Sequence, residues 1–246
     1  MKNLRRQIAF GIGLVMLSAL IYFIQLRLFR DERDTLFYLF QDLAFVPIQI
    51  LIVTVIIDQV LRLREKTAML NKLNMVIGTF FSEAGTHLLK SFSDFDHHVD
   101  RIRRELLVNR DWSDRQFARV MTDLQQYDYH IDVQKNDLGA LKLFLSKKRD
   151  FLLRLLENQS LLEHETFTEL LWAVFHLTEE LEARVDLRHL PSSDREHLAG
   201  DIRRAYVILI SEWLSYMKHL KKEYPYLFSL AVRTNPFDEH VSVTIK

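Results

Sequence analysis

The densest group of side chains able to bind a metal ion lies at Asp94, Asp96, His97, His98 and Asp100. Carboxylate oxygens and imidazole nitrogens are ligands of divalent metal ions, and a bound ion can activate water for hydrolysis. Asp94, His97 and His98 are therefore candidate metal ligands of a metal-dependent hydrolase. The alternative, an acidic and solvent-exposed helix start, is the favoured interpretation of this segment.

Other histidines stand one helical turn from a carboxylate. Asp194 precedes His197 by three positions, and His176 precedes Glu180 by four. A helical di-iron site requires paired Glu-x-x-His motifs, and the sequence contains none. We expect His176 to form a solvent-facing ion pair rather than to act as a general base.

Composition excludes several classes of chemistry. The 246-residue chain has no cysteine, which excludes disulfide bonds, thiolate metal sites and a cysteine nucleophile. None of its six glycines stands in a phosphate-binding loop, a dinucleotide-binding fingerprint or a serine-nucleophile elbow. The 33 basic and 33 acidic residues balance, so no basic face for nucleic acid is expected. We predict no cofactor, and an enzyme is the less favoured class.

Aromatic residues are frequent near the C-terminus, among them Tyr206, Trp213, Tyr216, Tyr224 and Tyr226. Aromatic rings bury large areas, so such a group most often forms part of a hydrophobic core. A ligand pocket is the alternative interpretation.

Two apolar runs, residues 8–29 and 36–57, are separated by a short charged segment. Each run is about 22 residues long, which as a helix measures roughly 33 Å and matches a hydrocarbon core of about 30 Å. The sequence thus predicts a transmembrane hairpin in residues 1–60. A cleaved signal peptide is the alternative for the first run, but that run is longer than usual and no clear cleavage site follows it.

Basic residues flank the cytoplasmic side of the predicted hairpin. Lys2, Arg5 and Arg6 precede the first run, and Arg62 and Arg64 follow the second. The positive-inside rule then places both termini in the cytoplasm. We expect a multi-pass protein of the cytoplasmic membrane.

Polar residues recur on one face of each apolar run: Ser18 and Gln25 in the first, Asp42 and Gln49 in the second. Asp58 lies on nearly the opposite face, at the cytoplasmic end. Such residues can hold two helices together through hydrogen bonds within the membrane, or line a path for ions in a homo-oligomer. The first role is favoured, and the five residues stay candidates for a pathway.

Residues 61–236 are predicted to form a cytoplasmic helical bundle, because glycine and proline are scarce and apolar residues recur at helical spacing. One helix should run from Leu36 to about Gly85. Further helices are predicted over residues 92–109, 113–127, 137–157, 163–185 and 193–224. Capping boxes at Ser113 and Ser193 open two of them. Residues 237–246 are expected to form an extended tail, and the fold class is an all-α membrane protein.

Two segments, residues 73–83 and 224–237, resemble an uncharacterised family of prokaryotic two-span membrane proteins with a cytoplasmic helical domain. The similarity extends over about residues 36–240. It implies the two-span architecture and a prokaryotic origin. It assigns no activity and no catalytic residue.

The missing catalytic motifs and the expected continuous helix favour a non-enzymatic integral membrane protein, whose cytoplasmic domain is an interaction, scaffold or sensor module. Its predicted partners are the lipid bilayer, further copies of itself in a homo-oligomer, and a protein bound through the helical domain. Two alternatives remain. One is a homo-oligomeric ion channel or transporter with the second run lining the path, and the other is the metal-dependent hydrolase.

Overall fold

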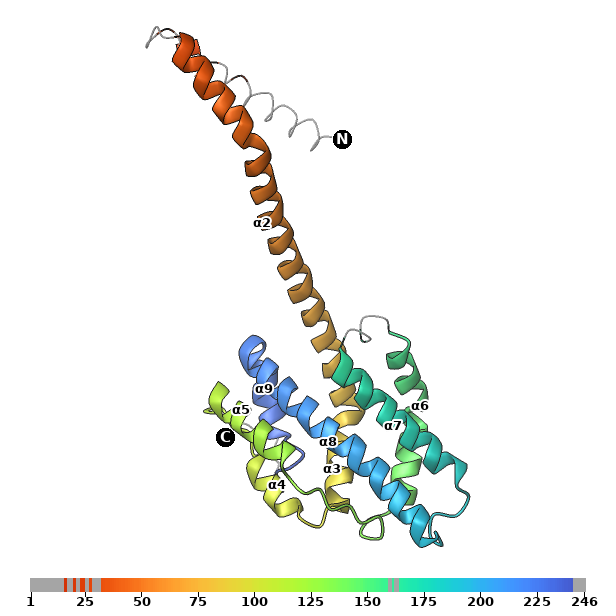
Figure 1. Cartoon of the computed structure of the whole chain (residues 1–246). Helices are drawn as coiled ribbons and strands as arrows, with labels where there is room; N and C mark the ends of the chain where they lie inside the picture. The colour runs from red at the N-terminus through yellow and green to blue at the C-terminus, as the bar shows by residue number, and fades with distance from the viewer. Residues whose placement is uncertain are drawn as a thin grey trace. The chain divides into compact units, whose positions relative to one another are not determined.

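The structure, a computed structural model, describes residues 32–158, 161 and 164–240, together with Met16, Leu20, Phe23, Ile24 and Arg27. Within these ranges the chain is built from about nine helices, which confirms the all-α prediction (Figure 1). The chain divides into two compact units, residues 1–66 and 67–246. The predicted pathway residues Ser18 and Gln25, and residues 241–246 of the predicted tail, lie outside the described residues.

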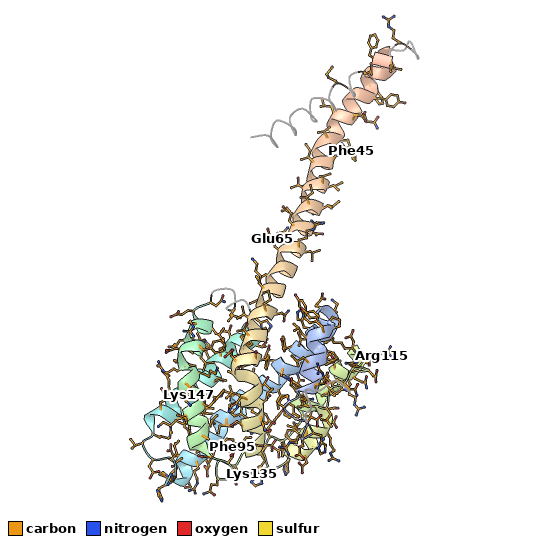
Figure 2. All side chains as sticks on the ribbon, turned by 180° about the vertical axis from the view of Figure 1, so that it is seen from behind. Phe45, Glu65, Phe95, Arg115, Lys135 and Lys147 are labelled. Carbon is orange, nitrogen blue, oxygen red and sulfur yellow. The ribbon has the colours of Figure 1, made fainter. Side chains whose placement is uncertain are left out.

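The first unit contains most of helix α2 (Glu32–Phe80), which is 49 residues long. Pro47 lies inside this helix, where its missing N–H removes one backbone hydrogen bond without ending the helix. Every side chain described between residues 37 and 63 is exposed, and most of them are apolar. Side chains stand out around the helix between the labelled residues Phe45 and Glu65 (Figure 2).

Over the described residues, no helix combines the length and the hydropathy required of a membrane-crossing segment. The predicted spans at residues 8–29 and 36–57 are therefore not supported. Most of the first predicted span lies outside the described residues. In the second, Asp42 and Gln49 interrupt the run of apolar side chains.

The second unit begins near the end of α2 and is organised around one long central helix, α8 (Ser192–Glu223). The other elements are the π-helical turn η1 (Phe81–Gly85), α3 (Thr86–Phe95), α4 (Val99–Glu105), α5 (Asp114–Gln125), α6 (Leu138–Leu156), α7 (Glu165–Ala183) and α9 (Pro225–Arg233). Helices α3, α5, α7 and α9 all pack against α8, and α6 packs against α7 (Figure 1).

The predicted continuous helix is confirmed by α2 and η1, and the predicted capping box is present at Ser113, which bonds Gln116 in both directions. The predicted capping box at Ser193 is wrong, because α8 begins one residue earlier, after Pro191, and has no side-chain cap. The predicted helix over 92–109 is also wrong. It breaks at Asp96, whose backbone is extended and forms an isolated bridge with Ile131.

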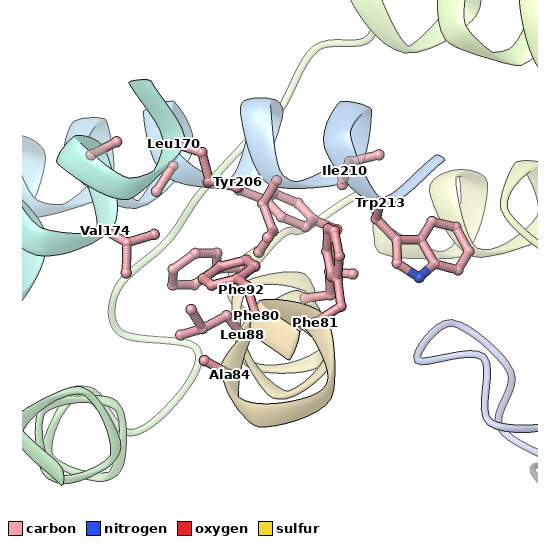
Figure 3. Packing of buried hydrophobic residues seen from close by; sticks show 14 of the residues in the cluster. Phe80, Phe81, Ala84, Leu88, Phe92, Leu170, Val174, Tyr206, Ile210 and Trp213 are labelled. Carbon is pink, nitrogen blue, oxygen red and sulfur yellow. The ribbon is translucent and has the colours of Figure 1, made fainter. Parts of the chain in front are cut away.

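The core of this unit is rich in aromatic side chains from the end of α2 and the segment that follows it. The ring of Phe80 packs edge-on against Phe167 of α7, with 5.3 Å between centroids. The ring of Phe81 stacks on Tyr216 of α8, also at 5.3 Å. Figure 3 shows Phe80, Phe81 and Phe92 beside Tyr206, all of them buried. These contacts explain why the apolar stripe of the long helix continues beyond the exposed stretch of α2.

The π-helical turn brings Phe80 and Phe81 so close together that only a glycine fits beside them. A Cβ atom on Gly85 would lie 2.6 Å from Cδ1 of Phe81 and 2.8 Å from Cε1 of Phe80. Thr86 closes the turn, because both its backbone N–H and its Oγ1 hydroxyl donate to the Phe81 carbonyl, the hydroxyl at 2.8 Å. Gly85 therefore permits the aromatic packing that joins η1 to α7 and α8.

We predict that Gly85→Ala lowers the free energy of unfolding by about 1–3 kcal/mol, the usual cost of overpacking a tight core. Gly200→Ala is the matched control. Gly200 is exposed within α8, and a Cβ atom there meets nothing within 4 Å, so this change should stabilise the helix by up to about 1 kcal/mol. Chemical denaturation of the full chain, followed by circular dichroism, measures both. Equal midpoints for the two variants would contradict the proposed role of Gly85.

Candidate functional site

A cavity of about 580 Å³ lies between the end of α2, η1, α8 and α9. Its wall is mainly apolar and aromatic and includes Gly78, Phe81, Trp213, Tyr216 and Tyr226. Cavities of a few hundred cubic ångströms with such a lining are typical of sites for small molecules. It is the main candidate binding site in the described part of the chain.

The cavity exists because two aromatic groups are held apart. Tyr216 stacks on Phe81 with an interplanar angle of 14°. Its hydroxyl lies where Gly78 leaves room, since a Cβ atom on Gly78 would be 2.8 Å from that oxygen. On the opposite side, Pro225 begins α9 immediately after α8 ends, so that Tyr226 and the residues that follow it form the second wall.

Apart from the carboxyl of Glu83, the polar groups of the cavity wall are hydroxyls, one amide, one imidazole and one indole. Asn74 Nδ2 lies 3.3 Å from His219 Nδ1. Burial lowers the pKa of His219, which keeps the imidazole neutral near pH 7, and its Nε2 atom is buried without a hydrogen-bond partner. Burial also raises the pKa of Tyr216, so its hydroxyl stays protonated. These groups favour binding of an apolar ring that carries a neutral polar substituent.

At the rim of the cavity, Glu83 accepts a hydrogen bond from Lys148 at 2.8 Å. This bond lowers the pKa of the Glu83 carboxyl, which is therefore ionised but paired. The hydroxyls of Thr79 and Thr86 donate to backbone carbonyls. Among the described lining residues, no hydroxyl is hydrogen-bonded to a carboxylate or an imidazole, which is the arrangement an activated nucleophile needs.

The side chains of the candidate ligands Asp94 and His97 have other partners, and His98 is held through its backbone. Asp94 Oδ1 lies 3.4 Å from Nη2 of Arg103, and His97 Nε2 lies 3.1 Å from Oδ2 of Asp132. The backbone N–H of His98 donates to the buried Asp96 carboxylate at 2.9 Å. Helix α3 ends at Phe95, so these neighbours in sequence do not share one helical face.

A different group of metal-binding side chains does meet in the described part of the chain. The ligand atoms of His176, His197 and Asp201 all lie within 4.8 Å of one another. The sequence shows each histidine one helical turn from a carboxylate, but it does not show that the two pairs meet. His176 and His197 belong to helices that are separated by a loop. Their proximity is a result of tertiary packing.

The polar residues predicted to line a membrane pathway lie on the surface of α2 where they are described. Asp42, Gln49 and Asp58 are exposed, and Asp58 Oδ2 lies 3.6 Å from Nη2 of Arg62 on the next helical turn. The channel alternative stays a prediction.

The pocket was foreseen only as the second interpretation of the C-terminal aromatic residues. Trp213 is buried, as expected of core, but Tyr226 is 71% exposed. The two segments 73–83 and 224–237 indicate the position of the cavity, since both contribute residues to its wall.

The structure therefore defines an all-α protein with an N-terminal helical segment and a C-terminal helical domain. The chain belongs to the MJ1433 family. The family model described as "MJ1433, N-terminal helical domain" matches residues 2–61. The model described as "Uncharacterized protein MJ1433, C-terminal helical domain" matches residues 69–233.

A similar protein of Methanocaldococcus jannaschii, described as uncharacterized protein MJ1433, is 48% identical over 238 residues, which cover 97% of this chain and 96% of the relative. No solved structure matches the chain. The expected membership of an uncharacterised family is confirmed. These matches do not show the two-span membrane architecture that we expected of that family.

Because the chain has no cysteine, one introduced thiol can report on the cavity. Ala231 lines the cavity. For the variant Ala231→Cys, we predict that the ratio of the labelling rate with N-phenylmaleimide to that with N-ethylmaleimide is about fivefold higher than for an exposed cysteine. The reason is that partial burial of the phenyl ring is worth on the order of 1 kcal/mol. Ala118→Cys on the surface of α5 is the matched control. Labelling rates are measured by mass spectrometry of the full chain, and identical preferences at both positions would exclude an accessible apolar cavity.

Proposed function

We propose that this protein is a non-enzymatic, membrane-attached member of the MJ1433 family, whose C-terminal helical domain works as a binding or sensor module. The observation that carries the proposal is the exposed apolar surface of α2. Leu51, Val53 and Ile56 are each more than half exposed, and described apolar neighbours along the same stretch are also exposed.

An apolar surface of this extent is costly in water, and on soluble proteins it marks a site that another surface covers. The exposed side chains lie on all sides of the helix, so a single flat protein surface would leave some of them in water. Lipid covers all sides of a helix at once. The proposal concerns coverage by lipid and does not depend on a described helix crossing the bilayer.

Charge near this stretch supports attachment at the cytoplasmic side. Arg62 and Arg64 follow the apolar stretch and are exposed. Basic side chains beside a membrane segment favour the cytoplasmic face and its anionic lipids, at about 1 kcal/mol per residue. The proposed location is the cytoplasmic membrane, with the helical domain in the cytoplasm.

Self-association is the second part of the proposal. Polar side chains such as Gln49 lie among the apolar ones on α2, and in lipid such groups form hydrogen bonds between helices. Copies of α2 packed together would provide those partners. The helical domain would then present several cavities in one assembly.

The binding role rests on the cavity between α2, η1, α8 and α9. Its aromatic wall and neutral polar groups suit a small molecule with an apolar ring. The absence of an activated nucleophile among its described lining residues favours binding over chemistry. Asn74, Gly78 and Tyr216 would contact the ligand.

Flotation with liposomes tests the membrane attachment. We predict that the full chain floats with liposomes in a density gradient and that the double variant Leu51→Lys, Val55→Lys does not, because each change replaces an apolar side chain that lipid would cover and so loses about 1.5–3 kcal/mol of apolar burial.

The matched control is Leu143→Lys with Val185→Lys, which changes the same residue types at exposed positions of the second unit. This control should float like the unmodified chain. The attachment is refuted if the unmodified chain stays at the bottom of the gradient or if both double variants float equally.

The assembly state is measured by light scattering of the full chain in mild detergent. We predict a protein mass of a dimer or a larger assembly of the 29.3 kDa chain, reduced by Gln49→Leu because the interhelical hydrogen bonds are lost at about 0.6–2 kcal/mol each. A strictly monomeric chain would remove self-association from the proposal.

A further inference from the structure

Helices α7 and α8 pack side by side and carry matching pairs of side chains. His176 and Glu180 lie four residues apart on α7, and His197 and Asp201 lie four residues apart on α8. Residues at this spacing occupy the same face of a helix. Each helix therefore presents one imidazole and one carboxylate to the same place.

The distances between these four side chains are short. Oδ2 of Asp201 lies 3.3 Å from Nε2 of His197 and 3.6 Å from Nε2 of His176. Glu180 also lies near both imidazoles, with Oε2 3.4 Å from Nε2 of His197 and Oε1 3.9 Å from Nε2 of His176. Both imidazoles thus direct the same ring nitrogen toward both carboxylates.

Asp201 is the most unusual member of the group. Its side chain is only 3% exposed, and Oδ1 has a partner in Arg204, whose Nη1 lies 3.4 Å away. Oδ2 is buried and has no hydrogen-bond partner. A buried carboxylate oxygen without a partner is costly unless a positive charge lies beside it. The atom between the two imidazoles is thus the one whose bonding is incomplete.

Glu180 is held in place from outside the group. Nη1 of Arg184 donates to Oε2 of Glu180 at 2.6 Å, and the same guanidinium donates to both carboxylate oxygens of Asp194. Such neighbours orient the ligands of metal ions and keep carboxylates ionised. The Oε1 atom of Glu180 keeps its capacity to bind a cation.

We propose that His176, His197, Asp201 and Glu180 form a binding site for a divalent transition-metal ion, with Zn²⁺ as the ion that the ligand set fits best. Bonds of about 2.0–2.2 Å to a tetrahedral Zn²⁺ put neighbouring ligand atoms about 3.3–3.6 Å apart. The distances of 3.3 and 3.6 Å from Asp201 Oδ2 to the two imidazole nitrogens match this spacing. Glu180 Oε1, at 3.9 Å from Nε2 of His176, would move inward to become the fourth ligand. Two imidazole ligands disfavour Ca²⁺ and Mg²⁺, which bind oxygen atoms. The ion links α7 to α8 and completes the bonding of Asp201.

Zinc binding by the full chain tests this proposal. The protein is prepared without a histidine tag, treated with a chelator, and titrated with Zn²⁺ in competition with a chromophoric chelator. We expect one Zn²⁺ per chain. His176→Asn and His197→Asn should each lower the affinity at least about tenfold, because even residues that only orient metal ligands contribute that much.

The matched control is His189→Asn. His189 also pairs with a carboxylate, that of Asp186 at 2.9 Å, but it lies outside the group. This variant should bind Zn²⁺ like the unmodified chain. Zn²⁺ should also raise the Tm of the unmodified chain and of His189→Asn, but not that of His197→Asn, since an ion that binds only the folded state stabilises it.

His197 is half exposed, so its replacement leaves the fold intact and the test does not depend on the buried Asp201. The proposal is overturned if the unmodified chain binds no stoichiometric Zn²⁺. It is equally overturned if His176→Asn and His197→Asn bind Zn²⁺ as tightly as His189→Asn.

Discussion

The burial of α8 along most of its length is the constraint on which the C-terminal domain depends. Helices α3, α5, α7 and α9 surround it, and Leu209, Leu214 and Met217 are fully buried. A helix surrounded in this way cannot place its polar residues freely, because each one that faces a neighbour needs a partner there. Both the cavity and the carboxylate–histidine group lie along α8, and both follow from this arrangement.

The cavity shows how close packing on α8 creates an opening beside it. Tyr216 stacks on Phe81, and its hydroxyl occupies the space that Gly78 leaves on α2. Trp213, one turn earlier on α8, packs against Phe237 with 5.3 Å between centroids. The rings of Tyr216 and Trp213 are held by these contacts at the two edges of the cavity. The space between α9 and the end of α2 therefore remains unfilled. The cavity is thus supported by the core itself.

Local sequence patterns predicted those features that depend on a single helix. The capping box at Ser113 and the continuity of α2 through Pro47 could be read from neighbouring residues. The break at Asp96 could not, because it depends on partners far along the chain: Tyr127 donates to the Asp96 carboxylate, and Ile131 bridges to its backbone. The site at Asp201 was missed for the same reason, since His176 reaches it only after α7 packs on α8.

Two buried carboxylates on α8 face α7, and their difference shows why one of them suits a cation. Glu212 accepts a hydrogen bond from the Thr166 hydroxyl at the start of α7, so a neutral donor of the protein satisfies it. Asp201 has no such donor at Oδ2 and instead faces two imidazoles. A carboxylate oxygen can accept from two N–H groups, but Oδ2 forms no hydrogen bond with either imidazole, whose Nε2 atoms lie 3.3 and 3.6 Å away. A metal ion lets both nitrogens and the carboxylate bind at once, because all of them then act as electron-pair donors. At the α7–α8 interface, the protein itself thus completes the bonding of Glu212, and the proposed cation would complete that of Asp201.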